Sequence, residues 1–268
     1  MIFRVLFFVF VFIPVMIVVI PLQALVNALK LPFWNVLPRF FHKVGCVFLG
    51  LRVTVIGQPA TGRATLLVSN HISWTDIIAI GSVADVTFVA KREVGDWFFV
   101  GMMARLQKTI FVDRTRKTDA KRTSTEMGAH MAGGNAVLLF AEGQSDIGTH
   151  VLPFRSALVG AAQHAMIEAG ATDVLIQPLT IAYTRLQGLP VGRNERSLIA
   201  WVKSRSLKQN VVEILGGGVK DVTVAFGAPL SLSQTDDRKA VTRAAENLVR
   251  ANLVALNRGL QLAVATNR

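Results

Sequence analysis

A histidine and an aspartate, His71 and Asp76, lie five positions apart in the segment 69–76, which reads Ser-Asn-His-Ile-Ser-Trp-Thr-Asp. An imidazole that is hydrogen-bonded to a carboxylate through one nitrogen has a fixed tautomer, and its other nitrogen can act as a base. The pair therefore predicts general-base chemistry. The alternative is a purely structural role in starting a helix, because the segment is rich in helix N-cap residues, namely Asn70, Ser73, Thr75 and Asp76.

The segments on either side indicate how the two side chains would meet. Ala64–Val68 is an apolar run typical of a buried strand, and Ile77–Gly81 is an apolar run that predicts a short helix. His71 would follow the end of a strand, and Asp76 would begin the next element. Loops at strand ends are common places for chemistry because a rigid scaffold holds them.

Three further predicted strands also end in polar or special residues. These residues are Asp113 and Arg114, Glu142 and Gly143, and Pro178. Because the carboxyl ends of parallel strands share one edge of a sheet, we expect these positions to converge with His71 on one crevice. Gly143 would allow a positive φ or the close approach of a backbone amide to a ligand. The guanidinium of Arg114 matches the geometry of phosphate or carboxylate.

The chain beyond residue 50 alternates strand-like and helix-like segments. The predicted strands are Leu51–Ile56, Thr65–Ser69, Val86–Ala90, Thr109–Val112, Ala136–Phe140, Val174–Tyr183, Ser197–Val202 and Val222–Phe226. The predicted longer helices are Thr118–Ala132, Ala157–Ala169 and Arg238–Leu256. Pro178 predicts a bulge or a sheet edge within its strand. The alternation indicates one α/β domain over residues 51–268, with a sheet covered by helices on both faces.

Composition points to a membrane surface. The chain has 268 residues, is 51% hydrophobic and carries a net charge of +12. Nucleic-acid-binding proteins are usually basic but not this apolar, and a multi-span membrane protein would show several long uncharged runs. We therefore expect a peripheral or singly anchored protein with no nucleic-acid partner. The one cysteine, Cys46, excludes an internal disulfide and a zinc site made of thiolates, and it fits a reducing compartment.

One uncharged run, Val5 to Leu29, is long enough to cross a hydrocarbon core. Pro14 and Pro21 interrupt it, so a straight span and a kinked or re-entrant helix both remain open. The basic residues that follow place the rest of the chain on the cytoplasmic side of the inner membrane; they are Lys30, Arg39, Lys43 and Arg52. Phe33 to Leu51 predicts an amphipathic helix that either lies at the interface or packs on the domain, and residues 1–50 are assigned to the anchor.

In this order and spacing, the four strand ends resemble the motifs of the glycerolipid acyltransferase family, typified by the 1-acyl-glycerol-3-phosphate acyltransferases. His71–Asp76 is similar to the histidine–four residues–aspartate block, Phe111–Arg114 to the second block, Phe140–Gly143 to the third with alanine for the usual proline, and Pro178 to the fourth. The resemblance runs from about Leu51 to Phe226.

The resemblance implies the acyltransferase fold with a hydrophobic N-terminal anchor, and transfer of an acyl chain from acyl-CoA or acyl carrier protein to a lysolipid. It implies no cofactor and no metal. It also implies a set of site residues: His71 and Asp76 as catalytic, and Asp113, Arg114, Glu142, Gly143, Gln144, Arg155 and Pro178 as substrate-binding.

The third block departs from the family pattern. Members that act on phosphate-bearing acceptors typically continue it with Thr-Arg, and that arginine is taken to contact the phosphate. Here Gln144-Ser145-Asp146 follows, and the acid would repel a phosphate. Val151–Leu158 and Ala182–Pro190 are similar to the lyso-ornithine lipid acyltransferase branch, whose head group carries an amine that Asp146 could accept. Arg155 could instead compensate for the missing arginine, which keeps phosphatidate synthesis open.

The expected mechanism is direct transfer in a ternary complex. There is no G-x-S-x-G elbow and no cysteine near the four blocks, which argues against a covalent acyl-enzyme. His71 would remove the proton from the acceptor hydroxyl, and backbone amides near Gly143 are candidates to stabilise the oxyanion. The alternative is a basic, membrane-anchored binding protein without catalysis, which would leave the four polar strand ends unexplained.

Overall fold

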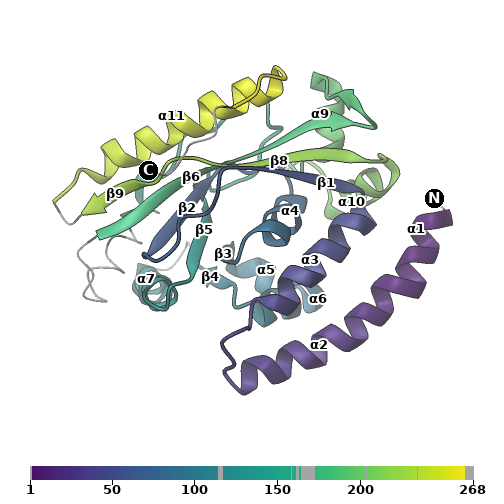
Figure 1. Cartoon of the computed structure of the whole chain (residues 1–268), viewed down its shortest axis with the longest axis horizontal. Coiled ribbons are helices and arrows are strands. Elements are labelled where there is room, and N and C mark those ends of the chain that lie inside the picture. Colours follow the sequence, from purple (N-terminus) through teal and green to yellow (C-terminus); the bar gives the residue numbers. More distant parts are fainter. Residues whose placement is uncertain are drawn as a thin grey trace.

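A computed structural model of the chain describes residues 2–113, 117–157, 159–160, 163, 173–202, 204–233 and 235–262 (Figure 1). One sheet runs through its centre in the order β1-β8-β6-β2-β5-β3-β4, with β7 and β9 paired to β6. The strands are Leu51–Ile56 (β1), Thr65–Ser69 (β2), Val86–Lys91 (β3), Ile110–Val112 (β4), Ala136–Phe140 (β5), Asp173–Leu186 (β6), Leu189–Pro190 (β7), Lys220–Phe226 (β8) and Leu230–Ser233 (β9). The helices are Ile2–Phe7 (α1), Ile13–Ala28 (α2), Val36–Leu49 (α3), Thr75–Val83 (α4), Arg92–Gly95 (α5), Phe98–Leu106 (α6), Lys117–Ala132 (α7), Arg193–Ile199 (α9), Leu207–Gly216 (α10) and Arg238–Asn257 (α11).

The strand that leads to His71, β2, lies in the middle of the sheet. It is parallel to β5 on one side and to β6 on the other, with Ser69 opposite both Phe140 and Leu179. β3 and β4 continue the parallel arrangement beyond β5, whereas β8 and β9 run antiparallel to β6. The sheet is therefore mixed, and the carboxyl ends of β2, β5, β3 and β4 lie along one edge.

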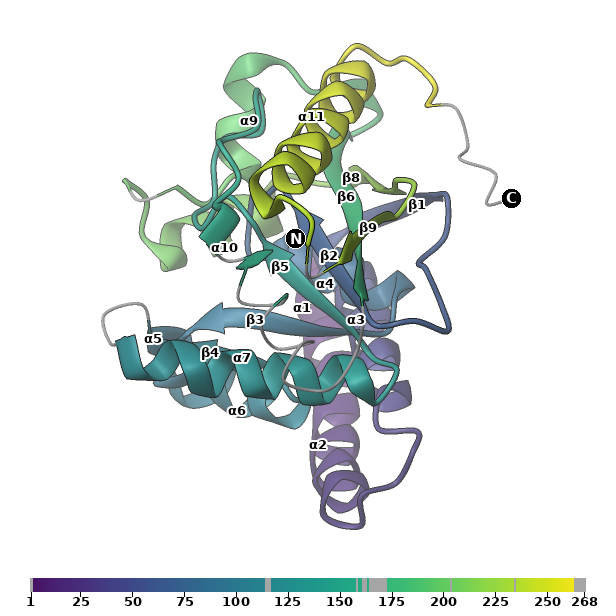
Figure 2. The ribbon, with the colours of Figure 1, turned by 90° about the vertical axis from the view of Figure 1, so that its left-hand side faces the viewer.

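Side chains along β2 alternate between two apolar clusters, one on each face of the sheet. Leu67 belongs to the cluster shared with α3 and α4, whereas Leu66 and Val68 belong to the cluster shared with α7 and α11. Figures 1 and 2 show α11 on one side of the sheet and α3 and α4 on the other. The prediction of an α/β sheet covered by helices on both faces is confirmed.

Pro178 is not at a sheet edge, and the irregularity in β6 lies elsewhere, so that prediction is wrong. Pro178 pairs in register with Val68 of β2, and the register shift in β6 falls between Tyr183 and Arg185. Its other side faces the connection between β8 and β9, where the Gly227 amide donates to the Pro178 carbonyl (2.8 Å). A proline is tolerated inside this strand because its missing amide faces a connection rather than a ladder partner.

Of the predicted strand Ser197–Val202, residues 197–199 form the end of helix α9, and residues 200–202 lie in neither a helix nor a strand. Ile199 is buried there, in the cluster that contains Tyr183. A short apolar run cannot be distinguished from a buried helix turn by periodicity alone, which explains the error. The predicted helix Ala157–Ala169 lies largely outside the described residues, as does Arg114.

The N-terminal apolar run forms one continuous curved rod, in which a π-helical segment, Phe8–Phe12, joins α1 to α2. Pro14 follows that segment in the first turn of α2, where a missing amide costs little, and Pro21 lies inside α2. The helix from Arg4 to Ala28 is long and apolar enough to cross a membrane, and only 6% of its most apolar window is buried.

Of the two alternatives for the following helix, the structure shows packing on the domain. α3 lies against α4 and buries Phe41, His42 and Cys46. Phe40 and Val47 remain exposed on its other side. The helix therefore belongs to the same apolar core as the sheet and also presents apolar side chains outward.

Candidate active site

His71 and Asp76 meet as predicted. β2 ends at Ser69, and the chain turns so that the Asp76 amide donates to the Ser73 carbonyl (3.0 Å) as α4 begins. This turn brings His71 Nδ1 within 2.8 Å of Asp76 Oδ2. The His71 side chain keeps 17% of its surface exposed, and its ring stacks on Phe140 with the centroids 4.0 Å apart. Asp76 is fully buried.

The carboxylate of Asp76 is tightly constrained. Besides the imidazole, its Oδ2 accepts the backbone amides of Ile72 (2.7 Å) and Ser73 (3.0 Å). These backbone donors require an acceptor oxygen, so the imidazole Nδ1 beside it carries the proton. His71 Nε2 then holds a free lone pair and has no hydrogen-bond partner among the described residues. That nitrogen is placed to accept a proton.

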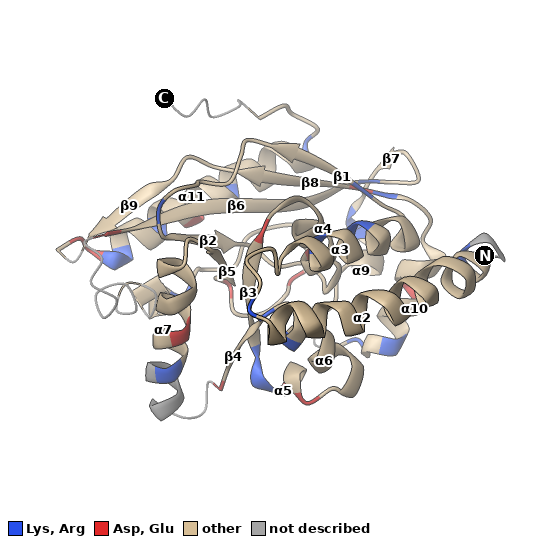
Figure 3. Cartoon of the chain, turned by 60° about the horizontal axis from the view of Figure 1, so that its bottom comes forward, with Lys and Arg blue, Asp and Glu red and all other residues tan. Residues whose placement is uncertain are grey.

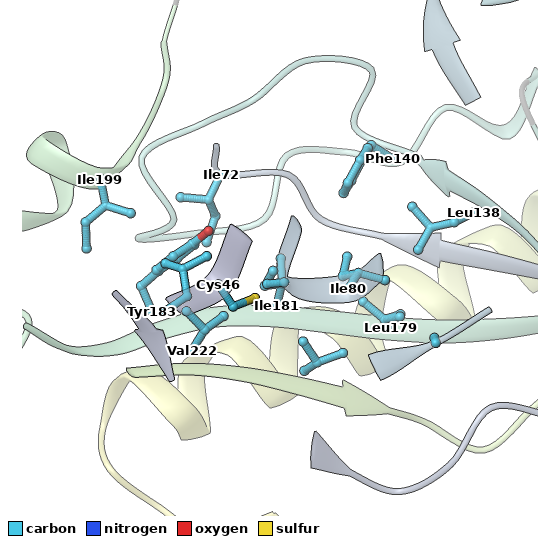
Figure 4. Close-up of a cluster of buried hydrophobic side chains, with 14 of the residues drawn as sticks. Cys46, Ile72, Ile80, Leu138, Phe140, Leu179, Ile181, Tyr183, Ile199 and Val222 are labelled. Atoms are coloured by element: carbon cyan, nitrogen blue, oxygen red, sulfur yellow. The ribbon is translucent and has the colours of Figure 1, made fainter. Parts of the chain in front are cut away.

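Tyr183, which the sequence reasoning did not assign to the site, completes the set of donors. Its hydroxyl donates to Asp76 Oδ1 (2.8 Å) and lies 2.6 Å from Thr75 Oγ1. Figure 4 shows the tyrosine rising from β6 with its oxygen beside Ile72. The chain has one tyrosine. A fully buried phenol near the end of a central strand needs a polar partner, and that was the available signal.

Asn70 fixes the end of β2 against β6. Its side-chain amide donates to the Ile181 carbonyl (2.9 Å), and its Oδ1 accepts the Ile181 amide (2.9 Å). On the other side, the Ala141 amide donates to the Ser69 carbonyl (3.0 Å), which continues the pairing with β5. The two residues before His71 are thus held from both sides, Asn70 by β6 and Ser69 by the residue that follows β5.

The side chain of Glu142 holds the loop that carries His71. Its Oε2 accepts the His71 amide (3.0 Å) and its Oε1 accepts the Leu152 amide (2.9 Å), with 3% of the residue exposed. Burial raises the pKa of Glu142 to about 8; the two backbone hydrogen bonds oppose the rise, and the charges of Asp146 and Asp76 add to it. Both oxygens are occupied by backbone amides, so the carboxyl group braces the His71 loop.

The loop after β5 wraps around His71. Gly143 has φ +75°, in agreement with the expectation of a positive φ, and its amide donates to the Phe140 carbonyl (3.0 Å). The Asp146 amide donates to the His71 carbonyl (2.9 Å). Among the amides considered for an oxyanion, those of Gln144 and Ser145 donate no hydrogen bond within the described part of the chain.

Asp146 lies close enough to Glu142 for its charge to help raise the pKa of that carboxyl group. Its carboxylate is 3.6 Å from His150 Nδ1, and its buried Oδ2 has no hydrogen-bond donor among the described residues. The Ser145 hydroxyl donates to the carbonyl of Trp201, and the Trp201 amide donates to the Ile72 carbonyl (3.0 Å).

The remaining predicted site residues lie farther from His71. Asp113 follows β4, which is separated from β2 by β5 and β3, and its carboxylate pairs with Arg92 (3.2 Å). Arg155 is exposed, and its backbone amide donates to the Ala141 carbonyl (2.9 Å). Pro178 is buried within β6, three residues short of the strand position that Asn70 contacts.

A family model for acyltransferases matches residues 52–182. A lyso-ornithine lipid O-acyltransferase of Brucella abortus is 43% identical over 234 residues, which are 87% of this chain and 88% of the relative. The chain belongs to the acyltransferase family. A second lyso-ornithine lipid O-acyltransferase, from Rhizobium meliloti, is 38% identical over 91% of this acyltransferase and 84% of its own length.

Two other comparisons bear on the acyltransferase. A 1-acyl-sn-glycerol-3-phosphate acyltransferase of Neisseria gonorrhoeae is 32% identical, but over 43% of this chain and 45% of its own. The crystal structure of PlsC, a 1-acyl-sn-glycerophosphate acyltransferase from Thermotoga maritima, superposes with a TM-score of 0.60 at 20% identity, covering 86% of this chain and 81% of PlsC. The predicted acyltransferase fold is confirmed by this similarity.

Proposed function

We propose that this acyltransferase transfers an acyl chain from acyl-ACP or acyl-CoA to the free hydroxyl of lyso-ornithine lipid. The observation that carries the proposal is the His71–Asp76 pair, with Nδ1 on the carboxylate and Nε2 open. The relatives that align along most of the chain are named for that acceptor, whereas the Neisseria relative aligns over 43% of it.

In the proposed reaction the acceptor hydroxyl donates a hydrogen bond to His71 Nε2. Its proton moves to that nitrogen as the oxygen attacks the thioester carbonyl. Buried Asp76 stabilises the imidazolium that forms and keeps the ring in its orientation. When the tetrahedral intermediate collapses, the C–S bond breaks and the imidazolium returns the proton to the departing thiolate. Atoms balance without any further reactant.

The oxyanion of that intermediate needs donors beside His71. The amides of Gln144 and Ser145 suit this role, because they belong to the loop whose Asp146 amide donates to the His71 carbonyl. The Gly143 amide suits it less well, because it already donates to Phe140. Preorganised backbone amides in a water-poor site are effective oxyanion donors.

Asp146 supports an acceptor whose head group carries an ammonium. Its carboxylate lies beside the loop that carries His71, and its Oδ2, which has His150 Nδ1 at 3.6 Å but no hydrogen-bond donor among the described residues, offers an acceptor for such a group. A phosphate in the same place would meet the negative charge of Asp146 and would find Ser145 where an arginine is usual. Arg155 is exposed and remains the alternative phosphate contact.

The attachment of the apolar rod at both of its ends supports the proposed membrane location. Near one end, Arg4 donates to the Gly218 carbonyl (2.8 Å); near the other, Asn27 donates to the Leu106 carbonyl (2.8 Å). The 25-residue helix is about 37 Å long, at 1.5 Å per residue, which exceeds the bilayer core. Because both ends are attached to one domain, we place the helix in the plane of the cytoplasmic leaflet of the inner membrane rather than across it.

The proposal is tested with full-length protein in detergent, offered acyl-ACP or acyl-CoA and one of three acceptors. The acceptors are lyso-ornithine lipid, 1-acyl-glycerol-3-phosphate and lysophosphatidylethanolamine, and lipid products are identified by mass. We expect the acylated ornithine lipid to dominate and to disappear with His71→Ala. Acylation of the phosphate acceptor alone would overturn the choice of acceptor. No transfer to any acceptor would favour a binding protein without catalysis.

A further inference from the structure

The corner between α5 and α6 exposes four consecutive apolar side chains. Trp97 is 38% exposed, Phe98 91%, Phe99 44% and Val100 40%. Scattered exposed apolar residues are common, but a contiguous group with two phenylalanines and a tryptophan marks an interaction surface. We call Trp97–Val100 the α6 corner.

The exposure of the α6 corner is imposed by a close-packed backbone. A Cβ on Gly101 would lie 2.1 Å from the Gly95 carbonyl oxygen, so the two short helices meet with no room for a side chain. The Gly95 carbonyl oxygen also accepts a hydrogen bond from Arg105 Nη2 (2.7 Å), and the Gly101 amide donates to the Trp97 carbonyl (2.6 Å). The corner is therefore held in place by its own contacts while its apolar side chains face outward.

The helix that begins at the α6 corner is attached to the apolar rod at its other end. At the far end of α6, the Leu106 carbonyl accepts both Gln23 Nε2 (3.2 Å) and Asn27 Nδ2 (2.8 Å) from α2. Figures 2 and 3 show α2 and α6 on the same side of the molecule. The rod exposes many large apolar side chains, which include Val9, Phe10, Ile17, Val18, Leu22 and Leu25.

The α6 corner is also next to the catalytic loop. The rings of Trp97 and Trp201 lie edge to face with centroids 6.1 Å apart. The Trp201 amide donates to the Ile72 carbonyl (3.0 Å), one residue after His71. A surface that covers the corner therefore reaches the neighbourhood of the base.

We propose that the α6 corner inserts into the same bilayer leaflet as α2. The enzyme then contacts the membrane through both α2 and the α6 corner, and His71 lies near the corner. The inference rests on the proposed membrane location. Phe98 would enter the acyl region while Trp97 lies at the headgroup level, where tryptophan is favoured. The charged residues around the corner are mixed, with exposed Lys91 and Arg92 beside exposed Glu93 and Asp96, so burial of apolar area is the main attraction.

Single-cysteine labelling tests the proposal directly. Cys46 is buried, so an environment-sensitive dye attached to Phe98→Cys reports chiefly on the corner, with unsubstituted protein as the background control. Val18→Cys on the rod is the membrane reference, and Val212→Cys on α10, 60% exposed, is the water reference. Vesicles of phosphatidylcholine and phosphatidylglycerol are prepared with and without brominated acyl chains.

We expect the dye at position 98 to shift to shorter wavelength and to be quenched by brominated lipid as strongly as the dye at position 18. The proposal is overturned if the dye at 98 behaves like the one at 212. If the dye at position 18 is quenched and the dye at position 98 is not, the rod lies in the membrane but the α6 corner does not, and the proposal is overturned. If neither is quenched, the membrane location fails as well, whereas the detergent assay of acyl transfer is unaffected by either result.

A kinetic variant gives an independent readout. Phe98→Asp places a charge in the leaflet and should lower turnover of acceptor presented in vesicles several-fold, while turnover of detergent-dispersed acceptor is unchanged. Val212→Asp is the matched control and should alter neither. An equal loss of turnover in vesicles and in detergent would show that Phe98 acts on the fold. That result would contradict the insertion of the α6 corner into the bilayer.

Discussion

The hydroxyl of Tyr183 donates to Asp76 Oδ1 across 2.8 Å, although the two residues are 107 positions apart. The hydrogen bond occupies the carboxylate oxygen that the loop around His71 leaves open, because Oδ2 already serves the imidazole and two backbone amides. β6 therefore contributes to the orientation of His71, the proposed base. In the proposed reaction Tyr183 is a positioning residue.

Tyr183→Phe should lower kcat while KM for the acceptor changes little. The substitution leaves Oδ1 buried without its donor, which costs about 1–3 kcal/mol and loosens the carboxylate that orients His71. Steady-state kinetics with varied acceptor separate the two constants, and urea unfolding gives the stability loss.

Thr75→Val is the matched control for that prediction. It removes the other partner of the phenol but leaves the hydrogen bond to Asp76 in place. We expect a stability loss with kcat largely retained. If Thr75→Val lowers kcat as much as Tyr183→Phe does, general packing rather than the carboxylate contact explains both.

Asp76→Asn should reduce kcat by roughly 10²- to 10⁴-fold, which is the range typical of lost general-base function. An asparagine cannot offer one oxygen to the imidazole and both backbone amides while also accepting the phenol. His71 is then free to adopt the wrong tautomer. Turnover is compared with that of His71→Ala at equal folded fraction, and retention of most of the wild-type rate would contradict the role of the pair.

The pH dependence of stability should report Glu142. Its pKa is raised from 4.5 to about 8 in the folded protein, so folding takes up a proton between these values. The contribution of Glu142 to the free energy of unfolding should therefore fall as pH rises through that window, by at most about 1.4 kcal/mol per pH unit, whereas His42 and His130, whose pKa values burial lowers, contribute in the opposite direction. Urea unfolding at several pH values between 5 and 8 measures the slope.

Glu142→Gln should flatten that slope, because the amide does not titrate. Glu126→Gln is the control, since Glu126 is a 40% exposed partner of Arg122 and should leave the slope unchanged. A slope that survives Glu142→Gln would assign the proton uptake to another group.

The contact between His71 and Asp76 could be predicted from the sequence, because both residues lie in one short turn between a recognisable strand and a recognisable helix. Each strand whose apolar run is bounded by turn residues, such as Thr65–Ser69, was also placed correctly. The contribution of Tyr183 was not, because it depends on the register of β6 against β2 and on distant packing. Local patterns carry no information on that register.

Two errors show the same limit. Pro178 was expected at an edge because a central strand normally uses every amide, but here its neighbour is the connection at Gly227. Ser197–Val202 has an apolar run that suits a strand or a buried turn of helix, and only the surrounding core decides. Both outcomes follow from tertiary contacts between segments far apart in the chain.

Acceptor choice should respond to the loop after Glu142. If Asp146 binds an ammonium, Asp146→Asn should raise KM for lyso-ornithine lipid by several-fold and leave 1-acyl-glycerol-3-phosphate unaffected or improved. Ser145→Arg should improve use of the phosphate acceptor, because it restores a guanidinium where the family usually has one. The ratio of kcat/KM for the two acceptors measures both effects.

Ser145→Ala separates the new charge from the lost hydrogen bond, since the Ser145 hydroxyl donates to the Trp201 carbonyl and Trp201 in turn contacts Ile72. The alanine variant should lower kcat/KM equally for both acceptors, so the ratio of the two values should not change. A ratio that shifts in Ser145→Ala as it does in Ser145→Arg would mean that loop position, not charge, selects the acceptor. No shift in any of the three variants would remove this loop from head-group recognition and leave the exposed Arg155 as the remaining contact to examine.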